Sequence, residues 1–294
     1  MHEERGLIRG FSAYDKIMKK SINAWSLAKE LTFEECFIAA KEAGFDGIEF
    51  NVDAPGGGHG LTMDITDAQL ADIKALSEKY ELPVVSISSA LHGGRLGAPC
   101  DQDNEDVKDV IRKQIQCAKA LDAGAVLVVP GAPLKDNSWK AMRARAIQTL
   151  KEMAAEIEAS GITVGLENVW NGFFTSPFDM RNFIEEVGSP SIKAYFDVGN
   201  VAAFSFPEHW IEVLSDQICR IHVKGYKSNG INQGGAWVDL LDGTIDWQKV
   251  VDAFKAIGFD GYLTAEVFPV RDYDDMNEFY RETVRDLGKI IELA

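Results

Sequence analysis

The amino-acid sequence predicts a single (β/α)8 barrel, the TIM-barrel fold, on two observations. Short apolar runs rich in β-branched residues alternate with amphipathic helical stretches along the whole chain, which favours parallel strands joined by right-handed crossovers. Eight such units of about 33 residues use up the 294-residue chain. No Pro/Ser-rich linker divides it. We therefore expect one domain over residues 1–294, with an N-terminal extension over 1–18 and the barrel over about 19–294.

Eight apolar runs are the candidate strands, and a helical pattern follows each of them. The strands are expected at Ser21–Trp25, Gly47–Phe50, Val84–Ser88, Ala125–Val129, Thr163–Glu167, Ala194–Asp197, Ile218–His222 and Tyr262–Val267. The helices are expected at Thr32–Ala43, Thr66–Tyr80, Asn104–Leu121, Trp139–Ala159, Pro177–Val187, Pro207–Leu214, Trp247–Ile257 and Asp274–Leu293.

Glycine marks four of the junctions between a helix and the next strand. The four sequences are "AGFDGIEF" from Ala43, "LDAGAVLVV" from Leu121, "ASGITVGLE" from Ala159 and "IGFDGYLTAEV" from Ile257. Glycine tolerates the left-handed backbone that ends many helices, so we expect it to cap each of these four.

The longest connection, Val223–Ile245, follows the seventh predicted strand. We expect it to have no regular structure of its own, and loops of this length are usually functional or mobile. In a barrel, the loops after the strands lie on the active-site face. The sequence therefore places this loop over the site.

The chain carries 30 Lys and Arg against 46 Asp and Glu, a net charge of −16. This charge repels phosphate backbones and anionic lipids, so we expect no nucleic-acid partner and no membrane surface. No apolar run is long enough to span a membrane, and no signal-peptide core follows the first methionine. The four cysteines lie too far apart in sequence for a zinc cluster or a disulfide frame. We predict a cytoplasmic protein.

Four polar residues end consecutive predicted strands that are otherwise apolar. They are Glu167 in "GLEN", Asp197 in "YFDVGN", His222 in "RIHVKG" and Glu266 in "TAEV". Side chains at the carboxyl ends of barrel strands point into the site. Three carboxylates and an imidazole repel one another there unless a cation joins them. Oxygen and nitrogen ligands together suit one divalent ion, namely manganese, magnesium, cobalt or zinc.

These segments, together with "DLLDGTIDW" and "GFDGYLTAE", resemble those of a known family. The chain is similar to the xylose isomerase-like barrels, which include sugar and sugar-phosphate isomerases and epimerases, over about Ser21–Leu293. The resemblance implies that the four strand-end residues hold one divalent metal ion. It also implies a small sugar or sugar-phosphate substrate. The ion then polarises a carbonyl, and Glu167 and Glu266 exchange a proton through a cis-enediolate.

The chain departs from the family members that epimerise free ketoses. Those enzymes are similar to it at the metal but have three further residues that hold the substrate. The matching positions here are Phe173, Asn200 and Ser228. "DVGN" and "HVKGYK" look closer to the pentulose-5-phosphate 3-epimerases. That resemblance implies that Asn200, Lys224 and Lys227 contact the substrate, with the lysines binding a phosphate or hydroxyl groups.

Four more residues are candidates for the wall of the pocket or its support. Trp25 ends the first predicted strand and Glu49 nearly ends the second, and each either lines the pocket or belongs to the core. His92 follows the third strand in a glycine-flanked loop, and it is either a histidine that contacts substrate or one at the surface. Asn168 adjoins Glu167 and is expected to make a supporting hydrogen bond.

Two other functions fit the same residues. A dehydratase of the inositol-catabolism type uses the same barrel and metal but removes water, and His92 is the obvious candidate for its general acid. A sugar-binding barrel without turnover is consistent with the missing substrate-holding residues. Aromatic residues such as Trp170 and Phe204 follow the first two ligands. They suggest either a lid over the site or a contact between copies, so a homo-oligomer is a possible form.

Overall fold

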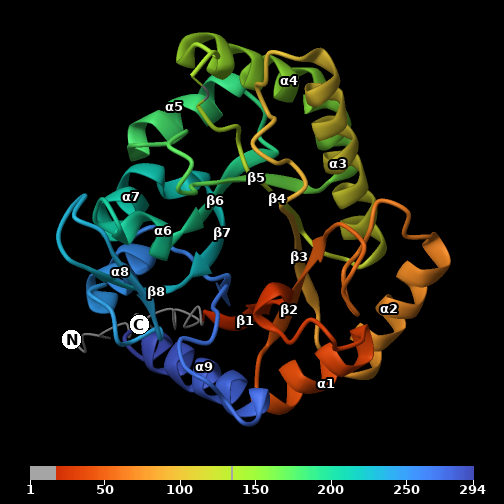
Figure 1. Ribbon diagram of the computed structural model, residues 1–294, viewed down its shortest axis with the longest axis vertical. Helices are drawn as coiled ribbons and strands as arrows, with labels where there is room; N and C mark the ends of the chain where they lie inside the picture. Colours follow the sequence, from red (N-terminus) through yellow and green to blue (C-terminus); the bar gives the residue numbers. More distant parts are fainter. Residues whose placement is uncertain (1–17, 134) are drawn as a thin grey trace, which may run out of the picture.

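A closed barrel of parallel strands forms the centre of the protein (Figure 1). The computed structural model describes residues 18–133 and 135–294. Within them the eight barrel strands are β1 (Lys19–Asn23), β2 (Gly47–Val52), β3 (Val84–Ser89), β4 (Ala125–Val128), β5 (Thr163–Glu167), β6 (Ile192–Asp197), β7 (Ile218–Val223) and β10 (Tyr262–Ala265). Their order around the barrel is β1-β10-β7-β6-β5-β4-β3-β2. The predicted (β/α)8 fold is confirmed. The predicted N-terminal extension lies outside the described residues except for Met18.

Helices surround the barrel on its outer side (Figure 1). The long ones are α1 (Phe33–Ala43), α2 (Asp67–Lys79), α3 (Asp101–Ala120), α4 (Trp139–Ser160), α5 (Pro177–Val187), α7 (Pro207–Leu214), α8 (Trp247–Ala256) and α9 (Met276–Ile291). Reciprocal hydrogen bonds between Thr32 and Glu35, and between Thr66 and Gln69, start α1 and α2 as capping boxes. The predicted starts at Thr32 and Thr66 therefore match the caps.

Three of the four expected glycine caps are confirmed. Gly44, Gly161 and Gly258 have φ angles of 99°, 74° and 70° and follow α1, α4 and α8. After α3 the left-handed residue is Asp122, with φ of 55°, while Gly124 does not take a positive φ. A short polar side chain such as that of aspartate tolerates this conformation. The sequence "LDAG" therefore has its cap two residues earlier than expected.

The long connection after β7 has structure of its own, so the expectation of a structureless loop is wrong. Its strands β8 (Gly225–Ser228) and β9 (Gly235–Val238) form an antiparallel hairpin. A Cβ atom on Gly225 would lie only 2.3 Å from the backbone oxygen of Asp239. Glycine at this position permits the close approach of the two backbones. The glycines at which β8 and β9 begin also interrupt the alternation of apolar and polar residues that marks a strand in sequence.

The inside of the barrel is more polar than expected. The prediction kept polar side chains at the strand ends, yet Ser21, Glu49, Ser86 and Thr264 are fully buried within their strands. The apolar core instead lies between the strands and the helices, as in the contact between Phe50 of β2 and Phe37 of α1. Among the described residues, no helix is long and apolar enough to span a bilayer.

Candidate functional site

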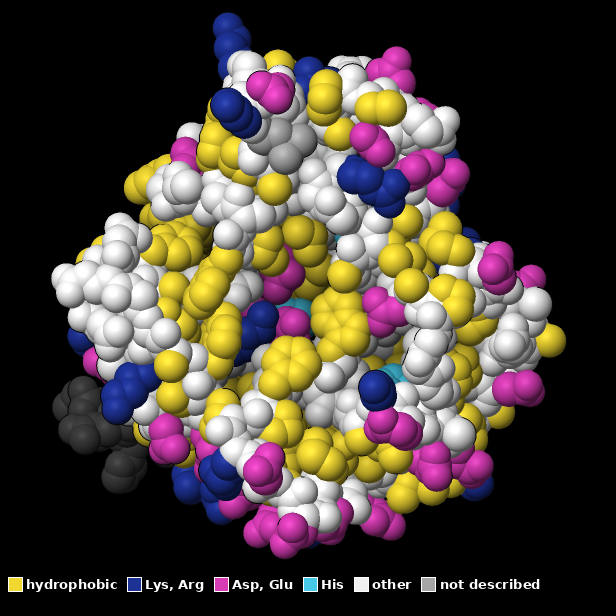
Figure 2. Space-filling model, viewed as in Figure 1, with side chains coloured by type: hydrophobic (Ala, Val, Ile, Leu, Met, Phe, Trp, Pro, Cys, Tyr) yellow, Lys and Arg dark blue, Asp and Glu magenta, His cyan; other side chains and the backbone are white. Residues whose placement is uncertain are grey.

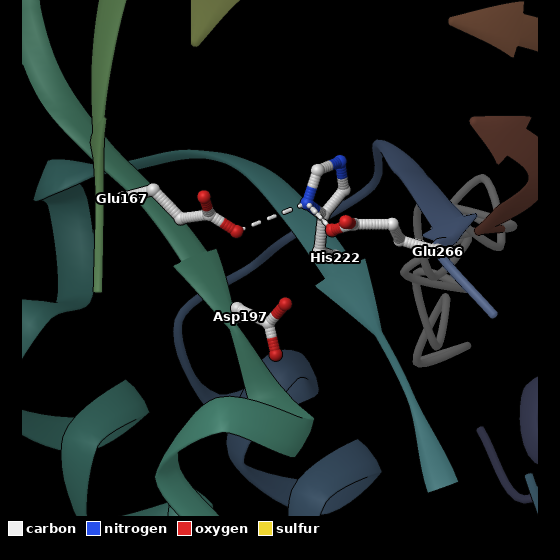
Figure 3. Close-up of side chains that lie close together, drawn as sticks. All are labelled: Glu167, Asp197, His222 and Glu266. Carbon is white, nitrogen blue, oxygen red and sulfur yellow. Dashed lines mark hydrogen bonds and ion pairs between the residues drawn. The ribbon is translucent and has the colours of Figure 1, made fainter. Parts of the chain in front are cut away.

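Four side chains from neighbouring strands meet at the carboxyl end of the barrel (Figure 3). Glu167 ends β5, Asp197 ends β6, His222 is the next-to-last residue of β7, and Glu266 directly follows β10. Each offers one ligand atom, and these atoms lie within 4.8 Å of one another. We refer to these residues as the acidic cluster. The fold thus assembles the set of residues that the strand ends predict.

The imidazole of His222 lies between the two glutamates of the cluster (Figure 3). Its Nδ1 is 3.2 Å from Glu167 Oε1 and 3.0 Å from Glu266 Oε2. Asp197 Oδ1 accepts a hydrogen bond from the backbone N–H of Asn200, at 2.7 Å. Asp197 Oδ2 is buried, and among the described residues no hydrogen bond reaches it. Among the described residues, the charged group that faces this oxygen is the ammonium of Lys224, at 3.0 Å.

Lys224 supplies a cation at the edge of the cluster. Its Nζ is 3.0 Å from Asp197 Oδ2 and 2.9 Å from Glu266 Oε2, as ion-pair contacts. Burial disfavours the ammonium, but the charges of Asp197 and Glu266 outweigh it and raise the pKa of Lys224 above its usual value. Lys224, which the sequence predicts to contact the substrate, thus lies directly beside two of the four cluster residues.

The two glutamates have different electrostatic surroundings. Burial raises the pKa of Glu167 to about 7, against an opposing hydrogen bond from His222. Burial acts in the same direction on Glu266, but Lys224 and His222 outweigh it and lower the pKa of Glu266 to about 2. His222 is also buried, yet the surrounding carboxylates hold its pKa well above the usual value.

Glu49 is part of the site, a role that the sequence left undecided. It is fully buried, and its Oε1 lies 2.8 Å from Nε2 of His222. Glu49 comes from β2, which lies across the barrel from β7. In the sequence, the signal for this role is an acidic residue inside an otherwise apolar strand. The contact itself leaves no local pattern, because His222 is 173 residues away.

Asn168 makes hydrogen bonds to the backbone of a cluster residue, and a contact between Asn168 and substrate stays a prediction. Its Nδ2 donates to the backbone oxygen of Asp197 at 2.8 Å, and its Oδ1 accepts from the backbone N–H of Asp197 at 2.9 Å. Asn200 donates through Nδ2 to the backbone oxygen of Asn168 at 3.0 Å. Both amides thus join the ends of β5 and β6, and a contact between Asn200 and substrate stays a prediction.

Trp25 and His92 differ in where they point. Trp25 follows β1 in a short 3-10 turn, η1 (Ala24–Ser26), and its Nε1 donates to Asp53 Oδ2 at 2.7 Å. Trp25 lines a cavity of about 360 Å³ on the loop side of β2. His92 is fully buried, with Nε2 3.0 Å from Gln114 Oε1 of α3. Its ring points toward α3, so contact between His92 and substrate stays a prediction without support from this geometry.

Aromatic side chains of the β8–β9 hairpin and the β5 loop cover one side of the cluster. Trp237 stacks on Trp170 with ring centroids 4.8 Å apart, and Tyr226 packs edge-on against both. Lys224 Nζ lies 5.7 Å from the centre of the Trp237 ring. Figure 2 shows a hollow at the centre of this face, with charged side chains at its bottom and hydrophobic ones around it. Lys227 is exposed on β8, and its contact with substrate stays a prediction.

A model of the protein family described as xylose isomerase-like TIM barrel matches residues 37–285. The chain belongs to this family. The resemblance noted in the sequence is therefore confirmed. The residues of the acidic cluster all lie within the matched range.

Known relatives of this xylose isomerase-like barrel include an uncharacterized protein of Methanocaldococcus jannaschii, 28% identical over 217 residues, which cover 70% of this chain and 72% of that protein. A putative L-ribulose-5-phosphate 3-epimerase of Escherichia coli is 22% identical over 249 residues, covering 83% and 86%. Among solved structures, a D-allulose 3-epimerase from Methylomonas sp. superposes with a TM-score of 0.75 at 17% identity, over 93% of this chain and 98% of that one. This last similarity supports the fold.

The structure gives local contacts to the three positions at which the sequence departs from the residues expected of a free-ketose epimerase. Phe173 is buried, with its ring centroid 5.4 Å from that of Phe183 in α5. Ser228 ends β8, where its hydroxyl donates to the backbone oxygen of Gly230 at 3.2 Å. Phe173, Ser228 and Asn200 thus each contribute to local structure.

Proposed function

We propose that the protein is a divalent-metal-dependent isomerase or 3-epimerase that acts on a sugar or a sugar phosphate. The observation that carries the proposal is the acidic cluster, which lies at the end of the barrel where such folds bear their active sites. The names of the relatives, an L-ribulose-5-phosphate 3-epimerase and a D-allulose 3-epimerase, support a carbohydrate substrate.

The cluster fits one divalent cation by its own chemistry. It combines three carboxylates with one imidazole nitrogen, a ligand set that suits manganese, magnesium, cobalt or zinc. Asp197 Oδ2 is buried, makes no hydrogen bond to the described residues and faces the ammonium of Lys224 at 3.0 Å, which offsets only part of the negative charge of the three acids. Buried acids this close together repel one another unless positive charge offsets them. Glu167, Asp197, His222 and Glu266 would therefore hold the ion.

The positions of the two glutamates suit proton transfer on a sugar. When bound, the ion polarises a substrate carbonyl and makes the neighbouring C–H more acidic. Epimerisation requires removal of a proton from one face of a carbon and delivery to the other. Glu167 and Glu266 lie on opposite sides of the His222 ring nitrogen (Figure 3). We propose that one of these glutamates removes the proton and the other delivers it to the opposite face of the carbon.

Lys224 and the aromatic cover complete the proposed site. The Lys224 ammonium, 2.9 Å from Glu266, is placed to bind a negatively charged oxygen of the substrate or its phosphate. Trp237 and Trp170 on the hairpin side keep part of the mouth apolar. An apolar wall excludes water and strengthens the electrostatic interactions inside the site.

Deuterium exchange from solvent tests the proposal. The protein, loaded with Mn²⁺, is incubated in D2O with a panel of pentuloses, hexuloses and their phosphates, and exchange is followed by NMR. Exchange at C3 identifies an epimerase, and exchange at C1 or C2 identifies an isomerase. Loss of water from the substrate identifies a dehydratase instead. The chelator-treated protein is the control. Measured metal binding without exchange in any compound would refute the proposed activity on this panel.

A further inference from the structure

We infer that Glu49 is a positioning residue, which holds His222 so that Nε2 carries the ring proton and Nδ1 keeps its lone pair for the metal. This inference rests on the metal site proposed above. It concerns a residue outside the acidic cluster, on a strand that contributes no ligand to it.

The two nitrogens of His222 face different partners. Nε2 lies 2.8 Å from Glu49 Oε1, and both side chains are fully buried. Nδ1 lies toward the acidic cluster, 3.2 Å from Glu167 Oε1 and 3.0 Å from Glu266 Oε2. The cluster can therefore use only Nδ1 as a ligand, since Nε2 is directed away to Glu49.

Within residues 18–133 and 135–294, the other hydrogen-bond partners of Glu49 all donate to it. Asn23 Nδ2 donates to Oε1, while the hydroxyls of Ser86 and Tyr195 donate to Oε2. The orientation of the Asn23 amide is set independently, because its Oδ1 accepts from the backbone N–H of Trp25 at 2.7 Å. A carboxylate surrounded by donors acts only as an acceptor. The contact with His222 therefore requires a proton on Nε2.

A fixed proton on Nε2 determines what Nδ1 can do. A metal ion that takes the place of the proton on Nδ1 leaves the ring with a single N–H, and a proton fixed on Nε2 then keeps the lone pair of Nδ1 for the metal. Tyr195 adds a second restraint, because its ring packs against the imidazole with centroids 4.6 Å apart. Glu49 and Tyr195 thus fix both the tautomer and the tilt of the metal-facing ring. Partners of this kind tune a histidine ligand, and their loss usually weakens metal affinity about 10- to 100-fold.

The test compares two substitutions of Glu49. Glu49→Leu removes the acceptor for Nε2–H, and Glu49→Gln keeps an acceptor oxygen while removing the charge. Asp286→Asn on α9 is the control, because Asp286 is another acid of low exposure and is not part of the cluster. Zn²⁺ affinity is measured by isothermal titration calorimetry. The tautomer of His222 is read in the zinc-loaded protein from long-range ¹H–¹⁵N spectra of ¹⁵N-histidine-labelled samples.

We expect zinc-loaded wild type and Glu49→Gln to show a protonated Nε2 and a metal-bound Nδ1. The Zn²⁺ dissociation constant should rise about 10- to 100-fold in Glu49→Leu, less in Glu49→Gln, and stay unchanged in Asp286→Asn. An unprotonated Nε2 in wild type or in Glu49→Gln would overturn the inference even if Glu49→Leu does not fold. So would unchanged affinity in a folded Glu49→Leu. If wild type binds no Zn²⁺, Mn²⁺ or Co²⁺, the proposed function fails, and this inference fails with it.

Discussion

Glu167 and Glu266 have the same side chain in opposite electrostatic surroundings. Burial raises the pKa of Glu167 to about 7, whereas Lys224 and His222 overcome burial and lower that of Glu266 to about 2. Pairs of acids whose environments separate their pKa values are typical of acid–base catalysis. Lys224 contributes strongly to this asymmetry, since its Nζ lies 2.9 Å from Glu266.

Neutralising either glutamate tests its role in proton transfer. Glu167→Gln and Glu266→Gln preserve shape but remove the basic oxygen, so each should lower the rate of solvent deuterium exchange about 100-fold or more. Exchange rates measured with saturating Mn²⁺ check this. Glu105→Gln, on the outer surface of α3, should stay within about twofold of wild type. Full activity of Glu266→Gln would contradict the two-glutamate scheme.

His92 predicts a pH dependence of stability that is separate from the site. Burial lowers its pKa to about 4, although hydrogen bonds to Gln114 and Ser89 act in the opposite direction. The unfolded chain, with a histidine pKa near 6.5, therefore binds more protons between pH 6.5 and 4. Stability from neutral His92 is present above pH 6.5 and is lost as the pH falls through this window.

The expected loss is about 2–3 kcal/mol between pH 7 and pH 4.5. Urea unfolding of wild type and His92→Gln at both pH values measures it, because the variant has no imidazole to protonate at this position. The difference between the two proteins in free energy of unfolding should shrink as the pH falls. A difference that is independent of pH would show that His92 does not titrate in this range.

At the scale of structural elements, hydrogen bonds from the Asn168 side chain join the end of β5 to the end of β6. Asn168 makes two hydrogen bonds to the backbone of Asp197, one as donor and one as acceptor. Asn168→Ala leaves both buried backbone groups without a partner, and each costs about 1–3 kcal/mol. We expect a free energy of unfolding lower by about 2–4 kcal/mol and weaker Mn²⁺ binding. Asn168→Asp retains the acceptor and should lose less, as denaturant titration would show. Equal losses in the two variants would contradict this account.

The short helix α6 (Val198–Ala202) packs so closely on Lys224 that it requires glycine. A Cβ atom on Gly199 would lie 2.5 Å from the Cβ of Lys224. Gly199→Ala should therefore displace Lys224, lowering the free energy of unfolding by about 1–3 kcal/mol and reducing activity. Gly288→Ala on α9 is the control, since a Cβ there meets nothing within 4 Å. It should stabilise the protein by about 0.5–1 kcal/mol. Equal stability changes in the two variants would rule out the steric argument.

The elements also show what the sequence could predict. The strand-end residues Glu167 and Asp197 were predictable because each breaks an apolar run where the strand ends. Glu49 was not, because its partner His222 comes from a strand across the barrel and no local pattern records that contact. The direction of His92 likewise depends on Gln114 of α3. The β8–β9 hairpin was missed because its short strands both begin with glycine.

At the scale of the whole molecule, the repeated strand and helix units made the barrel predictable from the sequence. The location of the acidic residues behind the net charge became clear only from the structure. Eight strand and helix units lead to one closed sheet, whatever the loops contain. The net charge of −16 says only that polyanions are repelled. The structure concentrates three of those acids within 4.8 Å of one another at one end of the barrel. Local repulsion there, and not the total charge, is what a cation would relieve.

Metal binding should therefore stabilise the whole fold. An ion that binds only the folded chain adds about 2.7 kcal/mol at a free concentration 100 times its Kd. For a chain of this size we expect a rise in Tm of about 4 °C. Thermal unfolding with Mn²⁺ and with chelator measures this shift. Asp197→Asn should remove most of it, because it takes the negative charge from one of the four proposed ligands. Glu105→Gln should keep it, since that acid lies outside the cluster.

Weak binding of Mn²⁺ to exposed acids would also raise Tm, but without saturating at one ion per chain. The Tm shift from the proposed site should therefore reach its plateau at one Mn²⁺ per chain. A shift of equal size in Asp197→Asn would place the stabilising ion elsewhere.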